Sequence, residues 1–393
     1  MSEPSRAPVT NEHPNTFVLK RAVPIPSLNL TVEEYEHPGT GAQHLHLSSD
    51  SSENVFMVAL RTVPEDSTGV AHILEHTALC GSERYPVRDP FFMMLRRSLN
   101  TFMNAFTSSD WTAYPFATQN RKDFGNLLDV YLDAVFFSRL DPLDFAQEGH
   151  RVEFENDDSS QPLVFKGVVF NEMKGAMSST PSILWDRLCH ELFPSNTYHF
   201  NSGGDPEHIP DLSYQELRDF YSEHYHPSNA IFLTFGDMSA ESHQCVFENS
   251  VLHRFEALDR KIEVALEAPF SAPKQATHPY AVDAEEGSAQ KTHLVMGWKL
   301  GESADLTAML EAQLVASVLM ENSASPLMHY LETTERGAAP SPLCGLEESM
   351  REMVFCCGIE GSEADHAEAF ESEVLACIER VVAGGISADK VEA

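Results

Sequence analysis

Three short segments with strand-like composition constrain the fold of this 393-residue chain more than any other feature of its sequence. They are residues 32–37, 44–48 and 55–60. In the second segment Leu45 and Leu47 alternate with polar residues, the third segment is apolar throughout, and the turn residues Pro38 and Gly39 follow the first. Runs of this length bounded by turn residues predict neighbouring strands. We therefore expect the chain to open with a small sheet.

A breaker-rich stretch after the third strand leads into a short helix. Pro64 and Gly69 interrupt the strand pattern, and residues 70–79 then have helical composition. Gly81 stands where a helix commonly ends on a left-handed residue. The sequence thus predicts a helix over 70–79, and this helix holds the residues that indicate chemistry.

The rest of the chain is predicted to form two domains with a similar order of elements. In the first, helices are expected at 90–98, 124–137, from 167 or 168 onward and 214–224, with paired strands in 100–118 and a strand at 230–236. In the second, strand, helix, strand and helix are expected at 292–300, 306–320, 353–359 and 366–382. We divide the chain into a disordered tail (1–15), a first domain (16–256), a linker rich in Ala, Pro and acidic residues (257–290) and a second domain (291–393).

His72 and His76 lie four residues apart in the segment AHILEHTALCG. At this spacing two side chains share one face of a helix, so both imidazoles can reach one ion. Glu75 lies near the same face, where its carboxylate can contact a water molecule at the metal without being a ligand. Histidine pairs arise by chance among 18 histidines, but His, Glu and His together after a helix start indicate a zinc ion with a general base.

A catalytic zinc ion normally has three protein ligands, so one ligand is missing from this helix. Cys80 continues the four-residue row, but it lies about 9 Å along the axis from the midpoint of the two histidines, and we exclude it. His44 and His46 form a second pair. They alternate with core-facing leucines on a predicted strand, and we do not expect them to bind a metal.

The composition limits the classes of partner and the cellular compartment that fit this chain. The net charge of −34 argues against nucleic acid or an anionic membrane as a partner, although a solubilising acidic surface explains the charge as well as a cationic partner does. No apolar run approaches the roughly 18 residues of a membrane span. The first fifteen residues lack a signal core and carry Glu3 and Glu12, which transit peptides usually avoid. Seven cysteines, an odd number, form no secreted disulfide pattern, so we predict a cytoplasmic location.

Three motifs occur in the order found in a known family, namely HILEHTALCGSERYPVRDPFF, SLNTFMNAFTSSDWTAYPF and GVVFNEMKGAM. With them the chain resembles the presequence protease branch of the pitrilysin or insulinase-like metallopeptidases, from Val23 to Met238 and more weakly beyond. The resemblance implies an α+β fold: mostly antiparallel sheets, each covered by helices on one side, in two related domains of which the second is incomplete. The predicted order of elements agrees with this fold.

The resemblance also supplies the third zinc ligand. In this family it is a glutamate in a downstream helix, which corresponds here to Glu172, 96 residues after His76 (172 − 76 = 96). Nearer glutamates are equally acidic, and we expect them on the solvated surface: Glu148, Glu153 and Glu155. Insulin-degrading relatives carry a further acidic residue seven positions before the ligand. This chain has Phe165 there, so a supporting carboxylate must come from elsewhere or be absent.

Family members bind substrate as an added strand at a sheet edge, which the resemblance places at Asn104, Ala105, Phe106 and Thr107. The implied activity is that of a zinc endopeptidase that degrades short unfolded peptides similar to targeting peptides, which are basic and acid-poor. Glu75 would take a proton from the attacking water and return it to the leaving amine.

Family members enclose the peptide between two halves, and the second half supplies an arginine and tyrosine pair that has no counterpart here. We therefore expect this chain to bind zinc but to cleave peptides feebly without a polypeptide equivalent to the missing C-terminal half. The alternative is a non-catalytic or regulatory homologue that only binds metal. Chelator-sensitive peptide cleavage separates these hypotheses.

Overall fold

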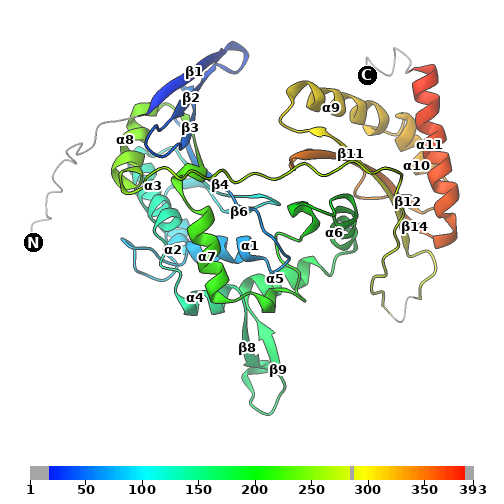
Figure 1. Ribbon diagram of the computed structural model, residues 1–393, viewed down its shortest axis with the longest axis horizontal. Helices are drawn as coiled ribbons and strands as arrows, with labels where there is room; N and C mark the ends of the chain where they lie inside the picture. The colour runs from blue at the N-terminus through cyan, green and yellow to red at the C-terminus, as the bar shows by residue number, and fades with distance from the viewer. Residues whose placement is uncertain (1–16, 284–286, 386–393) are drawn as a thin grey trace, which may run out of the picture. The chain divides into compact units, whose positions relative to one another are not determined.

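The structure, a computed structural model, describes residues 17–283 and 287–385 (Figure 1). The chain forms two compact units. Among the described residues, the first unit holds 17–174 and 201–263, and the second holds 175–200 and those from Val264 to Gly385. The chain therefore enters the second unit, returns to the first, and leaves it again.

The domain ranges expected from the sequence do not contain this crossing. The first domain, predicted over 16–256, and the second, predicted over 291–393, remain predictions as functional divisions. The predicted tail, 1–15, lies outside the described residues. The predicted linker, 257–290, contains no helix or strand in its described part.

An eight-stranded sheet forms the framework of the first unit. Its order is β1-β2-β3-β10-β4-β7-β5, and β6 pairs with β7. Of the described pairs only β3 with β10 is parallel. The strands are β1 (Val18–Ile25), β2 (Leu30–Glu36), β3 (Gln43–Ser49), β4 (Asn54–Arg61), β5 (Asn100–Met103), β6 (Phe106–Thr107), β7 (Trp111–Thr118) and β10 (Ala230–Gly236). The strands expected near residues 32, 44, 55 and 230 are confirmed.

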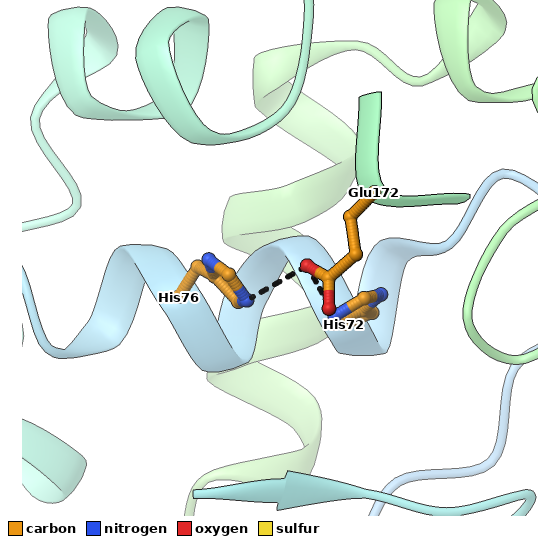
Figure 2. Close-up of side chains that lie close together, drawn as sticks. All are labelled: His72, His76 and Glu172. Carbon is orange, nitrogen blue, oxygen red and sulfur yellow. Dashed lines mark ion pairs between the residues drawn. The ribbon is translucent and has the colours of Figure 1, made fainter. Parts of the chain in front are cut away.

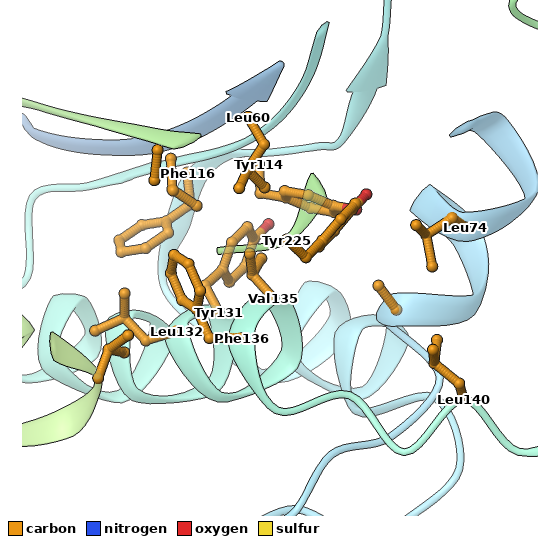
Figure 3. Close-up of a cluster of buried hydrophobic side chains, with 14 of the residues drawn as sticks. Leu60, Leu74, Tyr114, Phe116, Tyr131, Leu132, Val135, Phe136, Leu140 and Tyr225 are labelled. Atoms are coloured by element: carbon orange, nitrogen blue, oxygen red, sulfur yellow. The ribbon is translucent and has the colours of Figure 1, made fainter. Parts of the chain in front are cut away.

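Helices cover one face of this sheet and bury its apolar side chains. They are α1 (Val70–Ala78), α2 (Pro90–Arg97), α3 (Arg121–Phe136), α4 (Pro142–Glu148), α5 (Val168–Ala176), α7 (Tyr214–His224) and α8 (Ala240–Ser250). Alternate residues of β4 are buried, as expected where one sheet face meets a core. Figure 3 shows Tyr131 and Phe136 of α3 beneath the sheet and Leu74 of α1 beside them. Leu74 is fully buried, and burial of such a side chain contributes about 1.5–3 kcal/mol, so it fixes α1 against the core.

The ends of α1 differ from the expectation. Residues 70–78 are helical, which is one residue short of the predicted end, and Leu79 caps the helix, whereas Gly81 does not have a positive φ. The left-handed glycine is Gly69, with φ 72°, at the other end of the helix. The prediction for Gly81 was wrong, since Leu79 ends this helix in an ordinary right-handed conformation.

A two-stranded hairpin precedes α5 and had no signal in the sequence. It consists of β8 (Arg151–Phe154) and β9 (Leu163–Lys166), and it projects from the first unit (Figure 1). Gly167 follows it. A Cβ at this position would lie 1.9 Å from the carbonyl oxygen of Gly149, so only glycine fits between the hairpin and α5.

The second unit contains an antiparallel sheet in the order β11-β14-β12, with β13 paired to β14. Its elements are α6 (Thr180–Leu192), β11 (Thr292–Glu302), α9 (Leu306–Met320), α10 (Pro326–Thr333), β12 (Ala339–Pro340), β13 (Gly345–Glu347), β14 (Glu352–Ser362) and α11 (Ala367–Gly384). The elements predicted from residue 292 onward are confirmed, and the α+β class with mostly antiparallel sheets is as expected.

Helix α6, which the sequence did not predict, covers the second face of this sheet. Met296 and Trp298 pack with the α9–α11 core, so Gly297 between them faces the opposite side. A Cβ on Gly297 would lie 3.1 Å from Leu188 and 3.2 Å from Leu192, both on α6. The missing side chain allows the crossing segment to pack closely on β11.

Candidate metal centre

His72 and His76 lie on α1 with their imidazoles directed to one carboxylate oxygen on α5. Figure 2 shows both rings and the side chain of Glu172. The Nε2 atom of each histidine is 3.8 Å from Oε2 of Glu172. Glu172 is 55% exposed, so the space between the three side chains is open to solvent. The structure thus brings together the three residues predicted as ligands.

The three donor atoms lie within 4.8 Å of one another, and no other group of three His, Cys, Asp or Glu side chains in the described ranges does so. Zinc ligands at about 2.0–2.2 Å in a tetrahedral arrangement stand roughly 3.4 Å apart. A small contraction of the observed cluster would therefore fit one ion. The donor set, two imidazole nitrogens and a carboxylate oxygen, leaves a fourth position for water.

The second ring nitrogen of each histidine is already engaged. Nδ1 of His72 donates to the carbonyl oxygen of Gly203 at 2.9 Å, and Nδ1 of His76 donates to Oε2 of Glu148 at 3.1 Å. Because both partners are acceptors only, the proton of each neutral ring belongs on Nδ1 and the lone pair on Nε2. Metal-binding histidines in proteins almost always make such a bond, which fixes the tautomer and the ring orientation.

Glycines bring the Gly203 carbonyl close enough to bond His72. A Cβ on Gly69, the residue before α1, would lie 2.8 Å from the oxygen of Gly203 and 2.8 Å from Cα of Gly204. Any side chain at Gly69 would displace this loop and would also be strained by the positive φ. The sequence analysis treated Gly69 only as a helix breaker and did not find its role.

Glu148, at the end of α4, corrects one expectation. We expected it on the solvated surface, but its side chain is 15% exposed and bonds His76. It is the supporting carboxylate that Phe165 could not supply, and Phe165 itself packs near the rings of His150 and Phe170. The sequence carried no signal for Glu148, because the approach of α4 to α1 depends on the tertiary fold.

Charge around the histidines is negative. Burial lowers the pKa of His76, but the hydrogen bond to Glu148 and the charges of neighbouring glutamates outweigh it and leave the pKa above its usual value. Three glutamates act on His76, namely Glu75, Glu148 and Glu172. A cation is therefore favoured at this place.

Glu75 lies beside the cluster but outside it. Its side chain is 8% exposed, and its Oε2 accepts a hydrogen bond from the Thr107 hydroxyl at 2.6 Å. Thr107 belongs to the segment predicted to bind substrate, Asn104–Thr107. In this segment Phe106 and Thr107 form β6, whose only strand partner in the described part of the sheet is β7. Its other backbone edge is free of strand pairing there, which fits the predicted role.

The residues that we excluded from the metal lie elsewhere. The Cys80 thiol donates to the backbone of His76, and burial raises its pKa. The expectation that Leu45 and Leu47 face the core was wrong, because His44 and His46 are the buried residues of this strand. Both histidines bond the buried Thr234 hydroxyl at 2.8 Å. Glu153 pairs with Arg151 and Lys166 on the hairpin, as expected for a surface residue.

No helix in the described ranges is both long and apolar enough to cross a membrane. All seven cysteines are free thiols.

Two family models match the chain. The model described as Insulinase (Peptidase family M16) matches residues 61–180, and the one described as Peptidase M16 inactive domain matches residues 211–393. Curated relatives named "Presequence protease, mitochondrial" include one from Danio rerio, 45% identical over 96% of this chain, and one from Mus musculus, 42% identical over 96%. The chain spans 37% of the length of each.

Solved structures show the same fold at lower identity. A protease from Helicobacter pylori has a TM-score of 0.66 at 19% identity, over 92% of this chain and 82% of that one. Pitrilysin has a TM-score of 0.59 at 16% identity, over 92% of this chain and 37% of that one.

The relatives' names overturn the predicted cytoplasmic location, because each is called mitochondrial. That prediction used the composition of the first fifteen residues and the lack of a secreted disulfide pattern, and neither feature distinguishes one reducing compartment from another.

Proposed function

The chain belongs to the insulinase (M16) family of peptidases, in which its relatives are presequence proteases, and we propose from this premise that it is the zinc-binding part of a metallopeptidase. The observation that carries the proposal is the convergence of His72, His76 and Glu172 within 4.8 Å, with the remaining nitrogen of each ring bonded to an acceptor. Surface histidines that bind no metal do not generally converge on a carboxylate in this way.

Zinc suits the donor set better than the other common divalent ions. Imidazole nitrogen with one carboxylate oxygen is a frequent set for catalytic zinc, whereas magnesium and calcium prefer oxygen ligands alone. A bound zinc ion would lower the pKa of water toward about 7 and polarise the carbonyl of the scissile bond.

Residues of the chain supply the proton transfer and the alignment. Glu75 lies one residue from His76 on α1, near the ligands but not among them, so its carboxylate is placed to take a proton from the attacking water. The same carboxyl group then gives the proton to the leaving amine. The open edge of β6 would hold the peptide by backbone hydrogen bonds, with Phe106, 41% exposed, against an apolar side chain.

The proposed substrates are short unfolded peptides similar to targeting peptides, as the relatives' name presequence protease indicates. Such peptides are basic and acid-poor, and the net charge of −34 would attract them. We also propose a mitochondrial location on the basis of these relatives.

Full activity is proposed to need more than this chain, which spans 37% of its relatives' length. The family's second half supplies the arginine and tyrosine that help to bind the substrate. Loss of one oxyanion donor alone costs about 10² to 10³ in turnover. Adding the remaining part of a relative should therefore raise a feeble activity.

The test is to measure zinc content and hydrolysis of a basic peptide, with and without a chelator, in the parent chain and in two variants. Glu172→Ala should lose zinc and turnover, whereas the matched Glu153→Ala should keep both. Retention of zinc by Glu172→Ala together with its loss from Glu153→Ala would show that the third ligand is misassigned. Zinc binding without any chelator-sensitive cleavage, even with the relative's remaining part added, would favour the non-catalytic alternative.

A further inference from the structure

The carboxylate of Glu75 has a single hydrogen-bond donor among the described residues, the hydroxyl of Thr107. The bond is short, 2.6 Å, and it joins side chains 32 positions apart in the sequence, one on α1 and one on β6. Glu75 forms no ion pair with any lysine or arginine in the described ranges. The orientation of this buried carboxylate therefore depends on one hydroxyl.

Two rigid elements hold the donor and the acceptor. Thr107 is paired with Thr112 of β7 in the sheet register, and the two hydroxyl oxygens are 3.5 Å apart. The Thr112 hydroxyl is fully buried and lies 2.8 Å from that of Thr62. On the other side, Leu74, the residue before Glu75, is fully buried in the core. The backbones that carry the two partners thus have little freedom to separate.

The bond leaves one carboxylate oxygen for chemistry. Oε2 of Glu75 accepts from Thr107, so Oε1 is the oxygen with no protein donor in the described ranges. A general base must present an oxygen to the proton at hydrogen-bond distance, and a rotated carboxylate loses that geometry. The alternative is that Thr107 only provides a hydrogen bond to a buried carboxylate and so contributes to the stability of the fold.

We propose that Thr107 is a positioning residue, which holds the Glu75 carboxylate in the orientation that accepts the proton of the attacking water. This inference rests on the proposed function, because it gives Thr107 a role through Glu75. It is separate from the predicted contribution of the Asn104–Thr107 backbone to substrate binding, since it concerns the hydroxyl alone.

The experiment compares Thr107→Val, which removes the hydroxyl at nearly constant shape, with Thr107→Ser, which keeps it. Thr101→Val is the matched control, because Thr101 on β5 of the same sheet also donates to a glutamate, Glu53, at an exposed place outside the metal centre. Each is measured with the relative's remaining part added, for kcat, KM, zinc content and Tm. We expect Thr107→Val to lower kcat about tenfold to a hundredfold, with KM and zinc content nearly unchanged.

Thr107→Ser should restore most of the lost turnover, and Thr101→Val should behave as the parent. In the background of Glu75→Gln, Thr107→Val should cause no further loss, because a residue that acts through Glu75 has nothing left to position. Equal relative losses of turnover in both backgrounds, or parent-like kcat for a folded Thr107→Val, would overturn the proposal.

A second measurement needs no activity. Crystal structures of the zinc-free Thr107→Val and Thr107→Ser chains should show the Glu75 carboxylate rotated away in the first and retained in the second. An unmoved carboxylate in Thr107→Val would refute the positioning role. If Glu75→Gln hydrolyses peptides as fast as the parent, the proposed function itself fails, and the crystal structures still decide whether Thr107 orients Glu75.

Discussion

Two histidine pairs in the first unit show how differently one residue type is used. His72 and His76 stand four residues apart on a helix, with Nδ1 bonded to an acceptor and Nε2 facing the Glu172 carboxylate. His44 and His46 stand two residues apart on β3 and share the hydroxyl of Thr234. The first pair has lone pairs directed at a common point near solvent, and the second pair is closed within the core.

The pKa of His76 shifts in the opposite direction to those of His44 and His46. Glutamates near His76 outweigh burial and raise its pKa, whereas burial lowers the pKa of both His44 and His46. Gln244 donates to the remaining nitrogen of His44 at 3.1 Å, which leaves that ring no lone pair for a metal. Spacing alone therefore does not make a ligand. The hydrogen-bond partners of the two ring nitrogens and the burial of the ring decide whether a lone pair is available to a metal.

The largest effect is expected from Glu75→Gln, which tests whether proton transfer and metal binding are carried by different residues of the site at His72 and His76. Glu75→Gln should keep its zinc but lose about 10² to 10⁴ in turnover, because an amide cannot accept the water's proton. Zinc content by metal analysis and steady-state peptide hydrolysis provide the measurement. A loss of zinc in this variant would mean that Glu75 is a ligand and that the roles are wrong.

One pair of substitutions tests the distinction between the two histidine pairs. His76→Ala removes a proposed zinc ligand and should weaken zinc binding by more than about 100-fold, because the loss of a ligand costs more affinity than the loss of a residue that only supports a ligand. His46→Ala should leave zinc affinity unchanged and lower stability by roughly 1–3 kcal/mol, because it opens a buried polar contact. Competition titration with a chromophoric chelator measures the affinities, and urea unfolding measures the stabilities. Equal zinc affinities in the two variants would remove the distinction between the pairs.

A smaller effect is expected from the carboxylate behind His76. Glu148→Gln still accepts a hydrogen bond but removes the charge, so zinc affinity should fall about tenfold to a hundredfold. Glu155→Gln serves as the control. The sequence predicted that Glu155 is solvated, the structure shows it exposed, and its substitution should leave zinc affinity unchanged. Equal affinity in Glu148→Gln and the parent chain would show that the bond to His76 does not tune the metal centre.

The smallest effect is expected on the stability of the folded chain at acidic pH, and it concerns His243, which lies beside His44 and His46. His243 of α8 lies near His44 and His46, has no partner for either ring nitrogen in the described ranges, and has a pKa lowered by burial to about 3. Its unfolded pKa is about 6.5, so the unfolded chain binds the proton first as pH falls. Stability attributable to His243 is complete above pH 6.5 and is lost below it, by about 1.4 kcal/mol per pH unit.

His243→Leu should therefore flatten the acidic side of the stability curve, as measured by urea midpoints at pH 7.5 and 5.5. An exposed control, His208→Leu, should leave the slope as it is in the parent chain. A parent-like slope in His243→Leu would assign the acid sensitivity to the neighbouring His44 and His46 instead.

Local patterns predicted the elements that depend on neighbouring residues. The helices over residues 70–78 and 214–224 are found close to where they were expected, because helix starts and apolar periods are properties of short segments. The residue types on α1 also predicted a metal with a base. Glu172 came from the resemblance alone, since nothing local distinguishes it from nearer glutamates.

What the sequence could not predict depends on contacts distant along the chain. Glu148 reaches His76 because α4 packs beside α1, and Gly203 reaches His72 across 131 positions. The crossing of α6 into the second unit was missed for the same reason, because its apolar face meets a strand that follows about a hundred residues later. No pattern within α6 indicates that this helix packs on β11.

The Gly203 bond has a consequence for the order of folding. The chain must leave the first unit after Lys174, order the segment over Gly175–Phe200, and come back before the carbonyl that orients His72 is in place. Contacts so distant in sequence form late, because closing the intervening loop costs entropy before it is rewarded. During synthesis α1 is therefore present long before His72 is oriented, so on the proposed function a nascent chain would hold zinc weakly. Zinc would then be acquired by finished molecules, and metal loading would report completed folding of this part of the protein.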